Sequence, residues 1–408
     1  MKKNISIEKI LLIAYFIILG IYQLALYYKS PWDTTGLTVN QIQNTNIIVK
    51  SFPFFAFIIL IIFIAYRIIK KIPKNLFFPI LILIIFGVIW IGYTVFFDKV
   101  SITVLIRSNT TPVIMIMPIL ILIGYDHKWW ELLKKVFMII ACLSVVFAFY
   151  ECIQVFLLFG FAQRATASAA MYLTILGFYS TYSIVVLTDE WLKNRKILIL
   201  FLLIILLLNS GILQGRSWFL QIGILFLIYI LRVKNSFDKF DIKRVIIPVF
   251  IILVTSLIVV INFDFFLGLI YRFETSGDTR TFQLVAFFEQ VGFNKLLVGQ
   301  GIYANYTFRD DTNFRFIDNQ VLLIMFRYGI IPIILYLWLL LSPVFKSFYR
   351  GNKKLMIKSV ILISWFLSML GVSVFFNVTF NLAHSIILLS IGRLYYELKI
   401  SNRGVNKL

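Results

Sequence analysis

Long apolar runs recur along the whole chain, and short polar or basic segments separate them. Each run has about 20 residues, the length that a helix needs to cross the hydrocarbon core of a bilayer. The runs are continuously apolar and do not alternate, which favours helices over a membrane β-barrel. The pattern therefore predicts an all-α polytopic membrane protein that forms a single integral membrane domain over residues 1–408.

We expect about twelve transmembrane helices on this pattern. Pro112 and Pro118 bend or shorten the fourth helix, which is expected either to cross or to re-enter the membrane. The loop 126–135 carries Trp129 and Trp130, residue types that suit the headgroup region. The expected helices cover approximately residues 10–27, 47–69, 76–97, 104–125, 136–159, 169–187, 197–212, 218–231, 245–263, 321–341, 359–376 and 379–396.

Composition and charge agree with this pattern. The chain is 61% hydrophobic and 14% charged, with a mean hydropathy of +0.94 and a net charge of +21. Such a positive charge would suggest nucleic acid for a soluble protein, but in a membrane protein it gathers in short cytoplasmic loops. With the N-terminus in the cytoplasm, about 26 of the 39 Lys and Arg residues fall inside and about eleven outside. We therefore expect both termini in the cytoplasm and no nucleic-acid partner.

One long polar insert, residues 263–318, interrupts the apolar pattern between the ninth and tenth helices. The expected topology makes it a long extracytoplasmic loop. Gly299-Gln300-Gly301 predicts a tight turn, because no strand precedes it as a dinucleotide site would require. Residues 279–291 predict a helix that lies on the membrane interface. Its apolar positions are Phe282, Val285, Ala286 and Phe288, and its polar positions are Gln283, Glu289 and Gln290.

Arginines on the expected outer side need a physical reason, because basic residues prefer the inner side. Arg216 is the sharpest case, since it lies in a very short turn between two apolar runs. An ionisable group at membrane depth costs several kcal/mol unless it is paired or solvated. The planar guanidinium fork suits phosphate oxygens, so the arginines predict an anionic lipid-linked ligand such as a pyrophosphate. The alternative is pairing with lipid headgroups or with nearby carboxylates. The outer arginines are Arg107, Arg164, Arg216, Arg272, Arg280, Arg309 and Arg315, and the carboxylates are Glu151, Glu274 and Asp278.

Asp318 opens the tenth expected helix, at the boundary between the insert and the membrane. There it could act as a general base that takes a proton from a sugar hydroxyl. Asp318 and Asn319 are also ordinary helix N-caps, so a purely structural role is equally open. Arg327 lies about two turns deeper, where it could line the same cavity or stabilise Asp318.

Metal binding is not expected. Cys142 and Cys152 fall in one apolar run and are interpreted as small buried hydrophobic residues. His127 and His384 lie too far from other ligand types to suggest a metal site. We therefore expect neither a metal nor a cofactor.

In this arrangement the chain resembles the O-antigen ligase and repeat-unit polymerase family of bacterial envelopes, which includes the Wzy-type polymerases. The resemblance covers most of the chain and depends on the order of loose motifs within a shared topology. These are Arg164 before a small-residue helix start, Gly215-Arg216-Ser217 in a tight outer turn, Arg280 before Leu297-Val298-Gly299-Gln300-Gly301, and Asp318-Asn319 heading a helix with Tyr328-Gly329-Ile330.

The resemblance implies a GT-C-like architecture and a glycosyltransferase activity that is independent of metal. The donor would be an undecaprenyl-pyrophosphate-linked glycan on the outer face of the bacterial cytoplasmic membrane, and the acceptor a second such glycan. Arg164, Arg216, Arg272 and Arg280 are then expected to bind the pyrophosphate, and Asp318, Arg216 and Arg280 to act in catalysis. Besides membrane lipid, the resemblance suggests a chain-length regulator as a partner.

The chain departs from the ligases at one place, because their outer histidine would fall where Asp318 stands. This favours a polymerase that builds capsular, O-antigen or exopolysaccharide chains from repeat units. The alternatives are an O-antigen-type ligase that transfers glycan to another acceptor, and a flippase for lipid-linked oligosaccharides. A flippase would more often show two similar halves and short loops, whereas this chain has one large insert in its second half.

Overall fold

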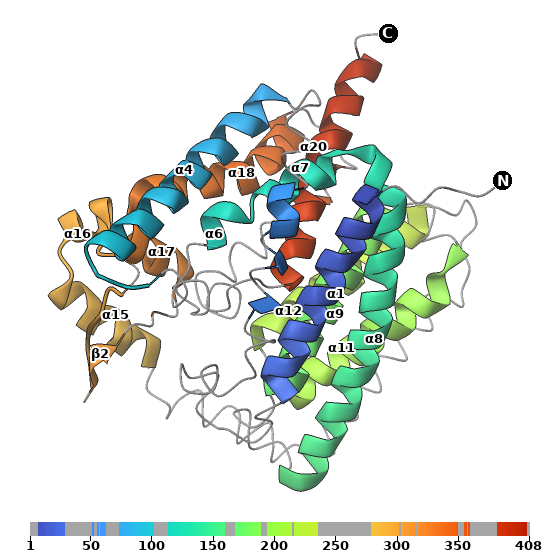
Figure 1. Cartoon of the computed structure of the whole chain (residues 1–408). Helices are drawn as coiled ribbons and strands as arrows, with labels where there is room; N and C mark the ends of the chain where they lie inside the picture. Colours follow the sequence, from blue (N-terminus) through green and yellow to red (C-terminus); the bar gives the residue numbers. More distant parts are fainter. Residues whose placement is uncertain are drawn as a thin grey trace.

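The computed structural model of the 408-residue chain is mostly helical (Figure 1). Five of the described helices are long and apolar enough to cross a membrane, as expected for an α-helical membrane protein. The described residues are 7–28, 51–52, 55–56, 58–62, 73–101, 113–159, 168–188, 194–213, 216–235, 279–301, 303–309, 311–314, 317, 319–349, 355–356, 358–359 and 382–405.

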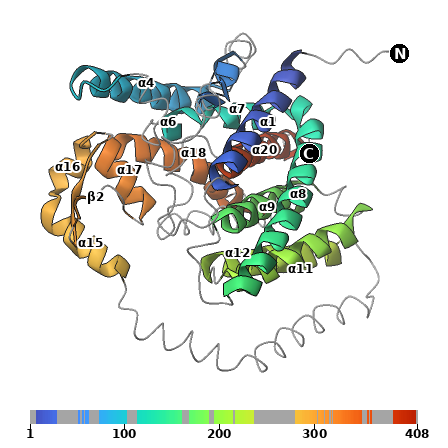
Figure 2. The same cartoon turned by 60° about the horizontal axis from the view of Figure 1, so that its bottom comes forward.

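Helix α9 (Ser168–Leu187) forms the centre of a helix bundle, and 94% of its membrane-length segment is buried. Its apolar residues lie on all sides, as expected for a helix without a solvent-facing side. The helices that surround it in Figures 1 and 2 are α1 (Ile7–Tyr28), α8 (His127–Phe159), α11 (Lys196–Ile212), α12 (Arg216–Asn235) and α20 (Leu382–Val405).

Helix α7 (Ile119–Tyr125) crosses α20 at two glycines. A Cβ atom added to Gly124 would lie 2.0 Å from the carbonyl oxygen of Leu389. A Cβ atom added to Gly392 would lie 2.1 Å from the carbonyl oxygen of Ile121. Small residues at such crossings let helix backbones approach closely, which is how helices associate when lipid surrounds them.

A second group of helices lies beside the bundle and is joined to it by α18 (Ile330–Tyr349), which packs against both α4 (Lys74–Phe96) and α20. The short helices α6 (Val113–Ile116) and α7 are separated by a turn at Met117 and Pro118. The bend that the sequence predicts at Pro118 is therefore confirmed.

Part of the polar insert folds into a small unit of its own, which we call the insert unit. It consists of α15 (Thr279–Gln290), α16 (Phe293–Val298) and an antiparallel hairpin of β1 (Tyr306–Phe308) and β2 (Asp311–Phe314). Its core is separate from that of the bundle and includes residues of α17 (Gln320–Tyr328), the helix that follows.

Aromatic rings hold the insert unit to α17. The ring centroid of Phe287 lies 5.3 Å from that of Tyr306 and 5.1 Å from that of Phe326, both in edge-on geometry. Phe287 is fully buried, and Phe326 is 2% exposed. Edge-on aromatic pairs add about 0.5–1.5 kcal/mol each beyond the burial of their area, so this triad stabilises the contact.

The predicted loop at 126–135 is wrong. Helix α8 already begins at His127, and Trp129 and Trp130 are buried instead of facing headgroups. The segment has no helix breaker, and both tryptophans share a buried stripe with Leu133 and Phe137. A 33-residue helix is about 50 Å long. The helix is therefore longer than a hydrocarbon core of about 30 Å, and its first turns pack on neighbouring helices.

The prediction of one continuous helix over 321–341 is also wrong. Gly329 has a φ of +86° and ends α17, after which α18 runs as the membrane-length helix. Only glycine adopts this backbone conformation without strain, so the break is encoded at this one residue.

The other expected helices can be compared where the structure describes them. Helices are confirmed near 10–27, 76–97, 169–187, 197–212, 218–231 and 279–291, and α20 extends the last expected helix to Val405. Most of the expected helices at 47–69 and 359–376, and all of that at 245–263, lie outside the described residues. The total of twelve therefore stays a prediction.

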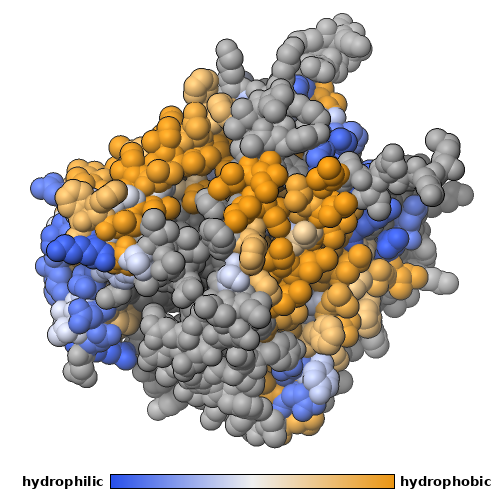
Figure 3. Space-filling model, in the orientation of Figure 1, coloured by the Kyte–Doolittle hydropathy of each residue, from blue (hydrophilic) through white to orange (hydrophobic). Residues whose placement is uncertain are grey.

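Helix α4 presents a long apolar surface, and large apolar side chains exposed along it are Phe78, Ile82, Ile85, Val88 and Ile89. The space-filling view shows a second apolar region over α1 and α8, whereas polar side chains gather at the edges of the molecule (Figure 3). Exposed apolar surface on this scale fits contact with lipid chains.

Candidate functional site

The helix bundle has one end that is rich in charged contacts. At this end the start of α8 meets the start of α1, where Lys128 Nζ lies 3.2 Å from Glu8 Oε2. The same helix start meets the C-terminal half of α20, where Arg393 Nη1 donates to His127 Nδ1 at 2.9 Å. Glu397 on α20 accepts from Arg393 Nε at 3.3 Å and from Lys358 Nζ at 2.7 Å. We call this the basic end.

The opposite end of the bundle is organised by Gln23 near the end of α1. Its side-chain oxygen accepts hydrogen bonds from the Tyr172 hydroxyl on α9 and, at 3.1 Å, from the backbone N–H of Leu382 on α20. The N-terminal parts of α9 and α20 therefore lie together at this end. The first turn of a helix carries unpaired N–H groups and a partial positive charge, so helix starts favour anions nearby.

Other helices begin facing the same region. In Figures 1 and 2, α15 and α17 run side by side in the same direction, so their first turns lie at the same end of the insert unit. In both views the first turn of α12 lies on the side of the bundle that faces this end. The starts of three helices from distant parts of the chain thus point to one region, which we call the helix-start region.

The structure locates the backbone of two predicted site residues. Arg216 is the first residue of α12, and Arg280 is the second residue of α15. Both therefore belong to helices that begin at the helix-start region, although their side chains are outside the description. Arg164, Arg272 and Asp318 lie outside the described residues altogether. Their predicted roles therefore stay predictions.

The N-cap of α17 is Asn319, whose side-chain oxygen accepts from the backbone N–H of Leu322 at 3.1 Å. Asp318, one residue earlier, lies outside the described residues. Its two neighbours are anchored, since Ile317 is fully buried in the core of the insert unit and Asn319 caps α17. Of the two roles that the sequence leaves open at this pair, Asn319 takes the capping one.

The insert unit is joined to α17 and α18 by a close contact between two glycines. A Cβ atom added to Gly299 would lie 2.6 Å from the backbone nitrogen of Gly329, and one added to Gly329 would lie 2.7 Å from the carbonyl oxygen of Leu297. The backbone N–H groups of Gln300 and Gly301 donate to the carbonyl oxygens of Phe326 and Arg327 at 2.8 and 3.0 Å. The predicted tight turn at 299–301 is thus a docking element, which we call the glycine contact.

Helix α4 supports the glycine contact from the other side. Trp90 Nε1 donates to the carbonyl oxygen of Tyr328 at 3.2 Å, and the two rings pack edge-on with centroids 6.2 Å apart. Arg327 is half-buried in α17, and its carbonyl oxygen accepts one of these hydrogen bonds, between those accepted by Phe326 and Tyr328. The insert unit is therefore fixed to α4, α17 and α18 together.

Phe287, Trp90 and Gly329 hold together the helices beside the candidate site, and these roles were not predicted from the sequence. A signal for Gly329 was present, since a glycine inside a helical pattern points to a break or a close approach. No sequence signal marked Phe287 as the buried ring, because the neighbouring Phe282 and Phe288 fit the apolar side of an amphipathic helix equally well. The predicted polar position Gln283 is 5% exposed, so α15 buries a side that the sequence assigns to water.

No group of three or more metal-ligating side chains occurs among the described residues. His384 lies in the bundle core, where its Nε2 contacts the Tyr336 hydroxyl. Cys152 is buried and Cys142 half-buried, and both are free thiols. Within the described chain these side chains serve packing.

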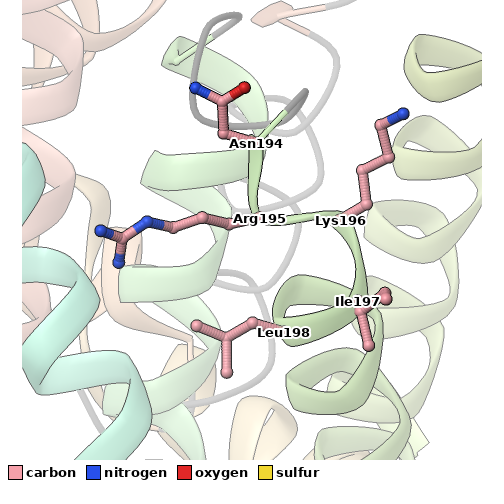
Figure 4. Close-up of a pocket in the computed structure, with 5 residues that line it drawn as sticks. All are labelled: Asn194, Arg195, Lys196, Ile197 and Leu198. Atoms are coloured by element: carbon pink, nitrogen blue, oxygen red, sulfur yellow. The ribbon is translucent and has the colours of Figure 1, made fainter.

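A separate cavity of about 470 Å³ lies at the start of α11 (Figure 4). It is lined by Asn194, Arg195, Lys196, Ile197 and Leu198. Figure 4 shows that the polar side chains of the first three point in different directions. Side chains that bind one anion must point their donors at the same place. The side chains around this cavity therefore do not form an anion-binding site.

No family model matches the chain, and neither a curated protein nor a solved structure is similar to it.

Proposed function

We propose that this protein is a polymerase that joins undecaprenyl-pyrophosphate-linked oligosaccharide repeat units on the outer face of the bacterial cytoplasmic membrane. The observation that carries the proposal is the helix-start region. Arg216 and Arg280 are the first and second residues of helices that begin there, and Asp318 precedes the N-cap of a third. Three of the positions that carry the resemblance, Arg216, Arg280 and Asn319, thus lie at the starts of helices that face one region.

The chemistry follows from charge. An acceptor hydroxyl oxygen forms a bond to the anomeric carbon of the donor sugar, and the bond from that carbon to the pyrophosphate oxygen breaks. The leaving pyrophosphate keeps the electron pair, and the carboxylate of Asp318 takes the hydroxyl proton. Arginines and helix starts that are already oriented stabilise the charge that develops on the leaving group. Arg164 and Arg272 belong to the same proposed pyrophosphate site.

The topology of the proposal places the basic end in the cytoplasm and the insert unit outside. Five cationic residues lie on or beside the parts of α8 and α20 that form the basic end or continue from it. They are Lys128, Lys134, Lys358, Arg393 and Lys399. Cationic residues on that side follow the positive-inside rule. The proposal includes twelve crossings, with both termini in the cytoplasm and membrane lipid and a chain-length regulator as partners.

Two other functions compete with this one. A ligase that transfers glycan to a different acceptor would use the same pyrophosphate site. A flippase would need no general base. The single large insert in the second half of the chain favours an enzyme over a flippase, which would more often show two similar halves and short loops.

The test is a reconstituted assay with purified protein in vesicles and lipid-linked repeat units as the only glycan, resolved by length on a gel. Arg216→Ala is expected to abolish products longer than one unit, because the leaving pyrophosphate loses its positive partner. Arg309→Ala is the matched control, since Arg309 is exposed in the turn of the insert hairpin. Long products from Arg216→Ala at normal yield would contradict the pyrophosphate role.

The same assay separates the competing functions. A ligase is expected to form no ladder until a second acceptor is added. A flippase is expected to form no ladder and to move the lipid-linked unit across the vesicle membrane. Either result from the unaltered protein would contradict the polymerase proposal.

A further inference from the structure

The insert unit carries a large apolar surface that no described element covers. One side of α15 is buried. Phe287 lies on it in the core of the unit, and Gln283 on the same side is 5% exposed. On other sides of α15 and α16, large apolar side chains are exposed, with Phe282 at 65%, Phe293 at 67% and Val298 at 73%. Val285 and Phe288 are exposed as well. Contiguous exposed apolar surface usually marks an interaction site.

This surface lies next to the end of an apolar membrane-length helix. Helix α4 ends at Phe96, and Phe96 and Phe97 are both strongly exposed. Asp98 then approaches the insert unit, since its Oδ2 lies 3.9 Å from the position that a Cβ atom on Gly301 would take. The exposed end of α4 therefore lies close to the insert unit. We call the exposed apolar residues of these neighbouring elements the rim surface: Phe96, Phe97, Phe282, Val285, Phe288, Phe293 and Val298.

The residues around the rim surface have the composition of a membrane boundary. Tyr93 stacks on Phe97 with ring centroids 4.8 Å apart, and Trp90 packs edge-on against Tyr93. Lys99 and Lys295 are exposed beside the same elements. Aromatic residues next to cations are typical of the headgroup region, where rings enter the interface and cations face lipid phosphates.

We propose that the rim surface contacts the lipid bilayer, so that the insert unit lies at the depth of the headgroups and is not surrounded by water. The occupant is lipid, because the rim surface includes the exposed apolar end of α4, a helix of membrane length. The core around Phe287 holds the other side of α15, and the glycine contact fixes the unit to α4, α17 and α18. Where the proposed function holds, this arrangement sets the start of α15, with Arg280, at the depth of a lipid pyrophosphate.

The test measures the depth of single labels in vesicles of phosphatidylethanolamine and phosphatidylglycerol. Phe282→Cys, Phe288→Cys and Phe293→Cys are made one at a time after both native cysteines are replaced by alanine, and each is coupled to a nitroxide. The accessibility of each label to oxygen, which concentrates in lipid, is compared with its accessibility to a water-soluble nickel complex. Thr307→Cys and Asn313→Cys are the controls, since both residues are exposed polar positions of the insert hairpin.

We expect labels at 282, 288 and 293 to show an oxygen-to-nickel ratio several-fold higher than that of the hairpin labels. Nickel accessibility equal to that of the hairpin would contradict the proposal, because the surface would then face water. Protection from both reagents would contradict it too, because a second copy or another protein would then cover the surface. None of these readings depends on enzymatic activity, so they are distinct from a failure of the proposed function.

A second measurement uses the unaltered protein in the same vesicles, with phosphatidylglycerol that carries a photoactivatable acyl chain. We expect cross-linked peptides from α15 and α16 in addition to those from α4. Cross-links on α4 without any on α15 or α16 would overturn the proposal even if one of the cysteine variants fails to fold.

Discussion

The helix bundle and the insert unit solve the packing problem in different ways. In the bundle, α7 and α20 meet backbone to backbone at Gly124 and Gly392, and hydroxyl groups form bonds between helices, such as Ser183 to Ser390 at 2.6 Å. In the insert unit, large rings fill a small core around Phe287. Lipid is as apolar as a leucine side chain, so helices within it associate through close contact and hydrogen bonds. A unit at the water boundary can use the burial of large apolar rings.

The largest effect is expected at the crossing of α7 and α20. Gly392→Val is expected to prevent the bundle from folding, because its Cβ atom would overlap the carbonyl oxygen of Ile121. Gly223→Ala is the control, since nothing lies within 4 Å of that added Cβ atom. The measurement is the yield of monodisperse protein in detergent. A normal yield from Gly392→Val would show that the two helices are not held by close backbone contact.

A smaller and local effect is expected in the insert unit. Phe287→Ala is expected to cost about 3–5 kcal/mol and to unfold this unit while the bundle stays intact. The measurement is limited proteolysis, with cleavage expected between α15 and α17. Phe288→Ala, on the exposed neighbour, is expected to leave the cleavage pattern unchanged. Equal cleavage of the two variants would show that Phe287 does not anchor the unit.

The glycine contact joins the insert unit to α17 and α18, and Gly299 and Gly329 are both buried there. Gly299→Ala is expected to cost about 1–3 kcal/mol from its φ of +89°, with a further cost from contact with Gly329. Gly292→Ala is the control, because its φ is −67° and nothing lies within 4 Å. Hydrogen exchange at the amides of Gln300 and Gly301 measures the effect. Unchanged protection in Gly299→Ala would exclude a tight docking at this turn.

The smallest effect on stability separates two adjacent residues at the start of α17. Asn319→Ala is expected to cost about 1 kcal/mol, seen as faster hydrogen exchange in the first turn of α17, because the cap is lost. Asp318→Asn is expected to leave that exchange unchanged and to remove the formation of long glycan products. Full activity of Asp318→Asn would exclude this carboxylate as the base.

Periodicity predicted much of the bundle and little of the packing that supports the site. Continuous apolar runs located α1, α4, α9, α11 and α12 closely, because a span of lipid requires an unbroken helix and leaves a plain signature. The start of α8 was placed too late, since a helix can continue past the membrane when neighbouring helices bury its rings. The core of the insert unit was missed because its key ring is not distinguishable by type from exposed neighbours.

By itself, the sequence determined that the chain is helical and built for a membrane, since the length and polarity of its segments are local properties. It also showed that arginines and a carboxylate interrupt the apolar pattern between those segments. Only the tertiary structure decided that Gly329 divides one expected helix, that Asn319 is the cap beside Asp318, and that the insert docks on α17. These features depend on contacts between residues far apart in the chain, which no local pattern encodes.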